Sequence, residues 1–381
     1  MTVDSVPFFR PSVGEAEIEV VAKAMRSGWL TTGPNAAAFE KEFSDQFEGD
    51  VFSVAVNSAT SGLHLGLEAL GVGAGDEVIV PTLTFTATAE VVRYFGATPV
   101  FVDVEESFCV GATAVEAAIT EKTKVIMPVH FAGRSCDLTS LREVADRHGL
   151  KILADSAHAL PSYHKGQLIG EGLADINVFS FYANKTMTTG EGGMLTTKDP
   201  VVAKRVKMMR LHGIDRDVFN RFSDLKASWI YDVVAPGYKY NLTDMAAAMG
   251  RVQLSRLQEF LEARHTQFQR YDEALKDLPI ILPPKAAEGD AHSCHLYIIQ
   301  LNDDAPLNRD ELITALKARN IGTSVHYRPL HQMTYWSKIA KGKFPFADQY
   351  FKRCVSIPLF MAMSEEEQAF VISALKDLLQ S

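Results

Sequence analysis

The feature that most constrains the fold is an alternation of short apolar segments and helical segments between residues 33 and 197. Seven apolar, β-branched segments are typical of strands: residues 51–56, 77–81, 98–104, 124–131, 151–154, 176–181 and 193–197. Helical periodicity fills several of the intervals, at residues 63–70, 87–95 and 138–148. This alternation predicts an α/β fold with a largely parallel sheet covered on both faces. Ligands of such sheets bind at the carboxyl ends of the strands, so the residues after each strand are candidates for a site.

The pattern changes after residue 254. We expect a long helix at residues 254–278, a strand at 295–301, a helix from Asn308 with Glu311 in the capping-box position, and a second strand near 323–326. A last amphipathic helix begins at Ser364. We therefore predict an N-terminal segment (residues 1–30) that packs with the small domain, a large α/β domain (31–254) and a small α+β domain (255–381).

Composition excludes several classes of protein. The formal net charge of −9 over 381 residues argues against a nucleic-acid partner, which would require a basic face. The four cysteines form no CxxC pair and indicate free thiols in a reducing compartment. The histidines lack metal-ligand spacing, so we expect no metal. With no basic-apolar leader and no apolar run of about 20 residues, we expect a cytoplasmic protein without a membrane contact.

The most informative segment runs from Val178 through Lys185 to a glycine-rich turn that ends at Gly193. A lysine that follows a strand into a cleft suits a Schiff base, because burial lowers its pKa toward that of a nucleophilic amine. Taken alone, the segment favours an exposed loop lysine before a flexible turn.

Asp155 ends the strand at residues 151–154 in the sequence Ala154-Asp155-Ser-Ala-His158. A solvated helix cap is the plain explanation of this acid. Pyridoxal phosphate, however, needs a carboxylate beside its pyridine nitrogen so that the ring can accept electrons. Asp155 and Lys185, which close nearby strands, could hold opposite sides of one such ring.

Two further segments suit the same cofactor. Residues 57–62 form a small polar turn between a strand and a helix N-terminus, which is a geometry that binds phosphate, although simple helix capping would use it as well. Phe85 follows the strand at residues 77–81 and could stack on a pyridine ring or lie in the core. The glycines of residues 71–75 precede a strand and so do not form a dinucleotide-binding turn.

These segments, in this order, resemble the DegT/DnrJ/StrS sugar aminotransferases. Further matches cover almost the whole chain and lie at residues 27–34, 128–133, 210–213, 236–244 and 322–327. The resemblance implies a fold-type-I pyridoxal phosphate enzyme with a large, mostly parallel seven-stranded sheet and a smaller α+β domain. It also implies a homodimer with shared active sites.

The resemblance implies a role for each matching residue. Lys185 is the Schiff-base lysine and Asp155 the partner of the pyridine nitrogen. The remaining cofactor contacts are Ala59, Thr60 and Ser180 at the phosphate, Phe85 on the ring face, His158 near the 3-hydroxyl, and Asn241, which reaches the cofactor of the neighbouring subunit. Tyr182, where the family usually has histidine, and His326, Tyr327 and Arg328 are candidates for contact with the substrate or for structural roles.

Within the family, residues 28–34, 155–159 and 236–244 are most similar to aminotransferases that act at C4 of UDP-linked keto-sugars, above all those that make UDP-4-amino-4-deoxy-arabinose. The resemblance implies L-glutamate as the amino donor, a nucleotide-linked keto-sugar as acceptor, and a place in lipopolysaccharide or polysaccharide biosynthesis. Lys185 favours amino transfer over dehydration, because the dehydrating branch has histidine there. The alternatives are amino transfer to a 3-keto-sugar or keto-cyclitol and a non-catalytic regulator that binds the cofactor.

Overall fold

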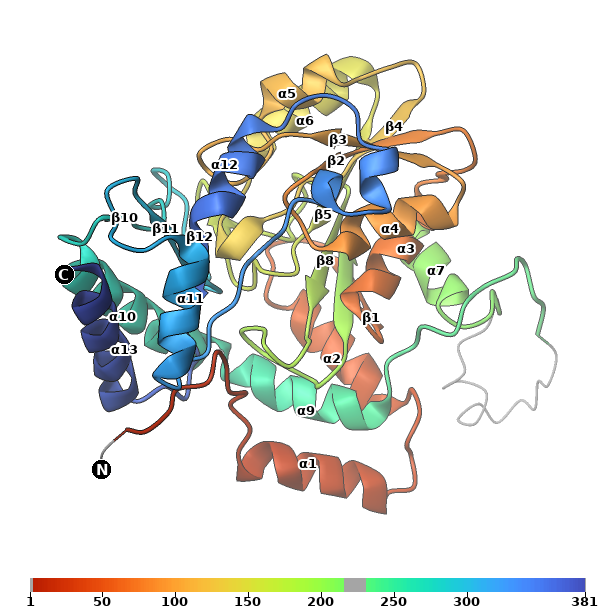
Figure 1. The fold of residues 1–381 in the computed structure, drawn as a ribbon. Helices are drawn as coiled ribbons and strands as arrows, with labels where there is room; N and C mark the ends of the chain where they lie inside the picture. Colours follow the sequence, from red (N-terminus) through yellow and green to blue (C-terminus); the bar gives the residue numbers. More distant parts are fainter. Residues whose placement is uncertain (1–2, 216–230, 381) are drawn as a thin grey trace.

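The computed structural model describes residues 3–215 and 231–380, and its larger part is built on one seven-stranded sheet (Figure 1). The sheet has the order β1-β9-β8-β5-β4-β2-β3. The strands are β1 (Phe52–Val56), β2 (Glu77–Pro81), β3 (Thr98–Val102), β4 (Thr123–Ile126), β5 (Lys151–Asp155), β8 (Ile176–Ser180) and β9 (Gly193–Thr197). Strand β9 runs opposite to the other six, so its pairings with β1 and β8 are antiparallel and the remaining pairings of this sheet are parallel. All seven predicted strands and the mostly parallel sheet are therefore confirmed.

Helix α3 (Ala59–Ala69) packs across β9, β8 and β5 and is buried along most of its length. Two glycines allow this close approach, because a Cβ at Gly62 would lie 2.7 Å from Val178 and one at Gly66 would lie 2.5 Å from Leu153. The other helices of this part are α2 (Pro34–Ser44), α4 (Thr86–Tyr94), α5 (Ala112–Ala117), α6 (Leu138–His148), α7 (Pro200–Met209) and α9 (Asp244–Ser255). The sheet thus holds the start of α3 against the carboxyl end of β8.

The second part of the molecule has its own apolar core around an antiparallel sheet in the order β10-β11-β12. Its strands are β10 (Ile280–Ile281), β11 (Tyr297–Leu301) and β12 (Cys354–Ile357), and its helices are α10 (Leu257–Leu275), α11 (Arg309–Ala318), α12 (Pro345–Arg353) and α13 (Glu365–Leu379). The expected capping box at Asn308 is present, and Ser364 forms a second one at the start of α13. Of residues 3–215 and 231–380, none belongs to a helix with both the length and the apolar character that a membrane crossing requires.

Two expectations for this part were wrong. Residues 323–326 form no strand, because only Ser324 makes a bridge, to Ser356, before the chain turns toward the large sheet. The strand that pairs with β11 in place of residues 323–326 is β12. The helix expected at residues 254–278 is divided at Arg256, where α9 ends and α10 begins.

The N-terminal segment contacts both parts. Val6 forms a bridge with Ile321 in the small part, whereas α1 (Glu15–Arg26) packs against α9, as Figure 1 shows. The buried carboxylate of Glu17 accepts hydrogen bonds from Gln253 and Arg256. The division of the chain into residues 1–30, 31–254 and 255–381 stays a prediction.

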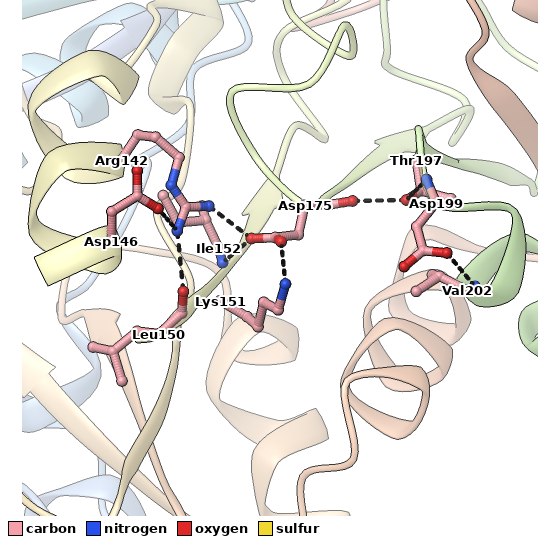
Figure 2. Close-up of polar contacts among 9 residues, drawn as sticks. All are labelled: Arg142, Asp146, Leu150, Lys151, Ile152, Asp175, Thr197, Asp199 and Val202. Carbon is pink, nitrogen blue, oxygen red and sulfur yellow. Dashed lines mark hydrogen bonds and ion pairs between the residues drawn. The ribbon is translucent and has the colours of Figure 1, made fainter. Parts of the chain in front are cut away.

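A polar cluster around Asp175 joins β5, β8 and β9 at the edge of the sheet where β5 and β8 begin (Figure 2). The carboxylate of Asp175, directly before β8, accepts hydrogen bonds from the backbone N–H of Ile152 at 2.8 Å, from Lys151 Nζ at 2.9 Å and from Arg142 Nη1 at 2.8 Å. Its backbone oxygen accepts a hydrogen bond from Thr197 Oγ1 at 2.8 Å. The cluster therefore fixes β5 relative to β8.

Candidate active site

A cavity of about 500 Å³ lies where the carboxyl ends of β5 and β8 meet the start of α3. It brings together most of the site residues that were predicted from the sequence. These are Ala59, Thr60, Phe85, Asp155, His158, Ser180, Tyr182, Lys185, His326 and Tyr327. They come from segments far apart in the chain, as expected for the carboxyl edge of a parallel sheet.

Two predicted residues do not line this cavity. Asn241 donates a hydrogen bond from Nδ2 to Thr32 Oγ1 at 2.7 Å, and its backbone bridges to Val56 at the end of β1. Arg328 is exposed and donates from Nη2 to the backbone oxygen of Gln332 at 2.7 Å. The predicted roles of both residues stay predictions.

Lys185 lies in the loop between β8 and β9, which hydrogen bonds hold in one conformation. The N–H of Lys185 donates to the backbone oxygen of Tyr182, and Thr188 Oγ1 donates to that of Phe181, both at 3.0 Å. The N–H of Thr188 donates to Gln253 Oε1 at 3.1 Å. Burial lowers the pKa of Lys185 to about 8, although the charge of Asp155 acts in the opposite direction. The neutral amine is therefore far more populated at neutral pH than in an ordinary lysine.

Asp155, the last residue of β5, is a buried carboxylate in the cavity wall. Thr88 Oγ1 donates to its Oδ2 at 2.9 Å and the N–H of Ala157 donates to its Oδ1 at 3.1 Å. Burial nevertheless raises its pKa, against the effect of these hydrogen bonds and of the charge on Lys185. A cationic group in the cavity would stabilise the ionised carboxylate.

The start of α3 is shaped for an anion. Ser58 Oγ caps the helix by accepting from the N–H of Ser61 at 3.1 Å, while the first N–H groups of any helix have no partner within it. The first residue of β9, Gly193, passes directly behind this turn. A Cβ there would lie 2.8 Å from the N of Ala59 and 2.9 Å from the backbone oxygen of Phe179. The backbone of Gly193 thus supports the turn at residues 58–59, and a side chain at position 193 would displace that turn.

Rings from both parts of the molecule form the remaining wall. Tyr327 Oη lies 3.2 Å from His158 Nε2, and the Tyr327 ring lies 6.0 Å from that of Phe85. His326 Nδ1 lies 2.8 Å from Ser356 Oγ, and burial lowers the pKa of His326 to about 4. Phe85 is 58% exposed, which leaves its ring free to stack on a bound group.

These residues fit pyridoxal phosphate. The buried carboxylate of Asp155 would pair with the protonated pyridine nitrogen, the N–H groups at the start of α3 would hold the phosphate, and Lys185 is the amine that the cofactor requires. Inference from the sequence missed other residues that line the cavity, among them Thr84, Val129, Asn184 and Glu191. Asn184 Oδ1 is buried without a hydrogen-bond partner, and its position directly before Lys185 was the one signal that could have indicated it.

The fold and the site together define a fold-type-I enzyme of the pyridoxal phosphate class. The family model of the DegT/DnrJ/EryC1/StrS aminotransferase family matches residues 11–376. The chain belongs to this family, whose members use pyridoxal phosphate, and the predicted family, fold and cofactor are confirmed.

Several relatives match over nearly the whole chain. The spore coat polysaccharide biosynthesis protein SpsC of Bacillus subtilis is 42% identical, with 98% of this chain and 97% of SpsC covered. The structure of Spr1654 from Streptococcus pneumoniae in its PMP form has a TM-score of 0.92 and 37% identity, with 98% and 99% of the two chains covered. PseC of Helicobacter pylori, an aminotransferase involved in the biosynthesis of pseudoaminic acid, has a TM-score of 0.90 and 26% identity, with 99% of each chain covered.

Proposed function

We propose that this protein transfers an amino group from L-glutamate to the C4 keto group of a nucleotide-linked keto-sugar, with a UDP-sugar as the first choice. The products are a 4-amino-4-deoxy sugar nucleotide and 2-oxoglutarate. The observation that carries the proposal is the cavity in which Lys185, Asp155 and the start of α3 meet. The names of SpsC and PseC support a sugar acceptor and a place in polysaccharide biosynthesis. The resemblance of residues 28–34 and 236–244 to C4 aminotransferases supports the position of amination.

Pyridoxal phosphate, when bound, accepts the electrons of a C–H bond beside an amino group and carries the nitrogen between the two substrates. Lys185 supplies the base for this chemistry. Its lowered pKa makes the neutral amine far more populated than in an ordinary lysine, so Lys185 can take the proton from Cα of the donor and deliver a proton to the keto carbon of the acceptor. Asp155 holds the proton on the pyridine nitrogen, and Thr88 holds Asp155 in position.

The other residues of the site bind and orient the cofactor and the substrates. Ala59, Thr60 and Ser180 hold the phosphate, Phe85 covers the ring face and His158 lies beside the 3-hydroxyl. Tyr182, His326, Tyr327 and Arg328 contact the donor or the sugar nucleotide. We further propose a cytoplasmic homodimer in which Asn241 reaches the phosphate in the partner's site.

The direct test incubates the holoenzyme with L-glutamate and a panel of acceptors, namely UDP-linked 4-keto-sugars, nucleotide-linked 3-keto-sugars and keto-cyclitols. Mass spectrometry of the amino product and assay of 2-oxoglutarate should show turnover with the 4-keto-sugar nucleotides and ping-pong kinetics. Preferred turnover of a 3-keto-sugar or a keto-cyclitol would refute the C4 assignment. A protein that binds the cofactor but reacts with none of the amino donors would favour the alternative of a regulatory protein.

Subunit mixing tests the shared site. If Asn241 acts on the partner's cofactor, a mixed dimer of K185A and N241A subunits contains one site with both residues intact. Mixing the two inactive variants should then restore activity. If Asn241 acts within its own subunit, neither site of the mixed dimer is intact and no activity returns.

A further inference from the structure

A buried glutamine joins the N-terminal segment to the loop that carries Lys185. Gln253, on α9, is 1% exposed, and its Oε1 accepts a hydrogen bond from the backbone N–H of Thr188 at 3.1 Å. Its Nε2 donates to the backbone oxygen of Ser12 at 2.8 Å and to Glu17 Oε1 at 2.7 Å. The amide therefore uses its acceptor on the loop and its donors on the N-terminal segment.

These partners require an amide at position 253. The N–H of Thr188 needs an acceptor, whereas the backbone oxygen of Ser12 and the carboxylate of Glu17 need donors. The same partners fix which end of the Gln253 amide is oxygen and which is nitrogen. A carboxylate of the same length would have no hydrogen to donate, and an apolar side chain would leave all three groups without this partner.

Thr188 passes this support on to Lys185. It is buried and follows Lys185 in the loop between β8 and β9. Its Oγ1 donates to the backbone oxygen of Phe181 at 3.0 Å and accepts from the N–H of Gly190 at 2.9 Å. Thr188 thus closes the loop around Lys185, and Gln253 holds the point of closure against α9.

The N-terminal segment contacts the site at a second point. The ring of Phe8 stacks on the ring of His326, with the two centroids 5.6 Å apart. His326 lines the active-site cavity. The same segment therefore touches the cavity wall directly and reaches the Lys185 loop through Gln253, so these two walls of the site share one support.

We infer that Gln253 is a positioning residue, which binds the N-terminal segment to Thr188 and thereby holds the loop in the conformation in which Lys185 lines the cavity. Gln253 does not line that cavity itself, so it acts on the chemistry only through Lys185. A displacement of about 1 Å from the productive geometry can cost about a hundredfold in rate. Loss of Gln253 should therefore slow the step that Lys185 performs, with little effect on substrate binding.

The inference rests on the proposed function of Lys185, but its first test needs no turnover. Hydrogen exchange of the holoenzyme, resolved to single amides by mass spectrometry, follows the N–H of Thr188. In the wild type this N–H should exchange at least about tenfold more slowly than an unprotected amide. Exchange at the unprotected rate would overturn the inference without any variant of Gln253.

Two matched substitutions separate the loop from general stability. Q253M keeps the length of the side chain and removes its hydrogen bonds. Q267M makes the same change at a buried glutamine of α10, whose Nε2 donates to the backbone oxygens of Phe360 and Met363. Exchange at Thr188 should rise about tenfold in Q253M alone, with the amides of β1 unchanged. An unchanged rate in Q253M, or an equal rise in Q267M, would overturn the inference.

The half-reaction with L-glutamate gives a second readout. Its limiting rate should fall about tenfold in Q253M, while the glutamate concentration that gives half of this rate stays within about twofold of the wild type. Q267M should keep the wild-type rate. A rise in that concentration with an unchanged limiting rate, or an equal loss of rate in both variants, would overturn the inference. If the wild type reacts with no amino donor, the proposed function fails, and the exchange of Thr188 alone decides whether Gln253 holds the loop.

Discussion

Removal of the Asp175 carboxylate should destabilise the sheet at the end opposite the site (Figure 2). In D175A, the loss of the bond to Arg142 costs about 1.5 kcal/mol, because both side chains are only 22% exposed. Lys151 is 56% exposed, so its contact contributes at most about 0.5 kcal/mol. The N–H of Ile152, left without its acceptor, adds about 1 kcal/mol. We therefore expect a loss of about 3 kcal/mol in the free energy of unfolding.

Urea unfolding followed by circular dichroism measures this loss, at one protein concentration because the proposed dimer would make the stability depend on concentration. The matched control is D146A, which removes another carboxylate from Arg142, but one that is 68% exposed. It should cost less than about 0.5 kcal/mol. Equal losses in D175A and D146A, or a D175A protein as stable as the wild type, would refute the reasoning.

The stability that the charge of Asp175 contributes depends on pH. Burial raises the pKa of Asp175, but hydrogen bonds from Ile152, Lys151 and Arg142 outweigh it, so the pKa in the folded protein is lowered. A carboxylate of this kind stabilises the folded state above its unfolded pKa of about 3.9, and the contribution disappears as the pH falls through the lower folded value. D175N should therefore differ from the wild type at pH 7 and match it in strong acid.

Three other substitutions test the account. Burial lowers the pKa of His64 to about 4, whereas the unfolded chain takes up the proton near pH 6.5. The buried neutral ring therefore contributes its full stability above about pH 6.5, and up to about 3 kcal/mol is lost as the pH falls toward 4. H64Q should lose less stability than the wild type between pH 6.5 and 4.5. T88V removes the donor to Asp155 and should lower kcat/KM about tenfold. G193A should weaken cofactor affinity about tenfold, because its Cβ would displace the backbone at Ala59.

Each of these substitutions has its own contrary result. An acid profile of H64Q identical to that of the wild type would show that another group dominates acid sensitivity. T84V leaves the bond from Thr88 to Asp155 in place, so an equal loss in both variants would contradict the role of Thr88. An equal loss of cofactor affinity in G193A and in G73A, whose Cβ would lie no closer than 4.0 Å to a neighbour, would contradict the role of Gly193.

The strands of the large sheet were predictable because their signal is local. Each is a short apolar segment bounded by turns, and the parallel arrangement places Asp155, Ser180 and Lys185 at one edge. The cavity could therefore be anticipated from the ends of the strands. Residues 323–326 misled because the β-branched Thr323 and Val325 are typical of a strand, yet only Ser324 pairs with β12.

What could not be predicted depends on contacts between distant segments. Thr88 supports Asp155 across 67 positions of the chain, and nothing near Thr88 distinguishes it from a capping or surface threonine. Arg264 occurs in a charged helix where an exposed side chain is the usual expectation. Its burial depends on the backbone oxygens of Cys294, His295 and Leu359, which lie 30, 31 and 95 positions away in the chain.

The central claim is that Lys185 holds pyridoxal phosphate for transfer of an amino group. Its most direct test is the visible absorption spectrum of the purified protein before and after addition of L-glutamate, with K185A measured alongside. We expect a cofactor band in the wild type that glutamate bleaches, and no such response in K185A. A protein that binds no pyridoxal phosphate, or a K185A variant that responds as the wild type does, would contradict the account.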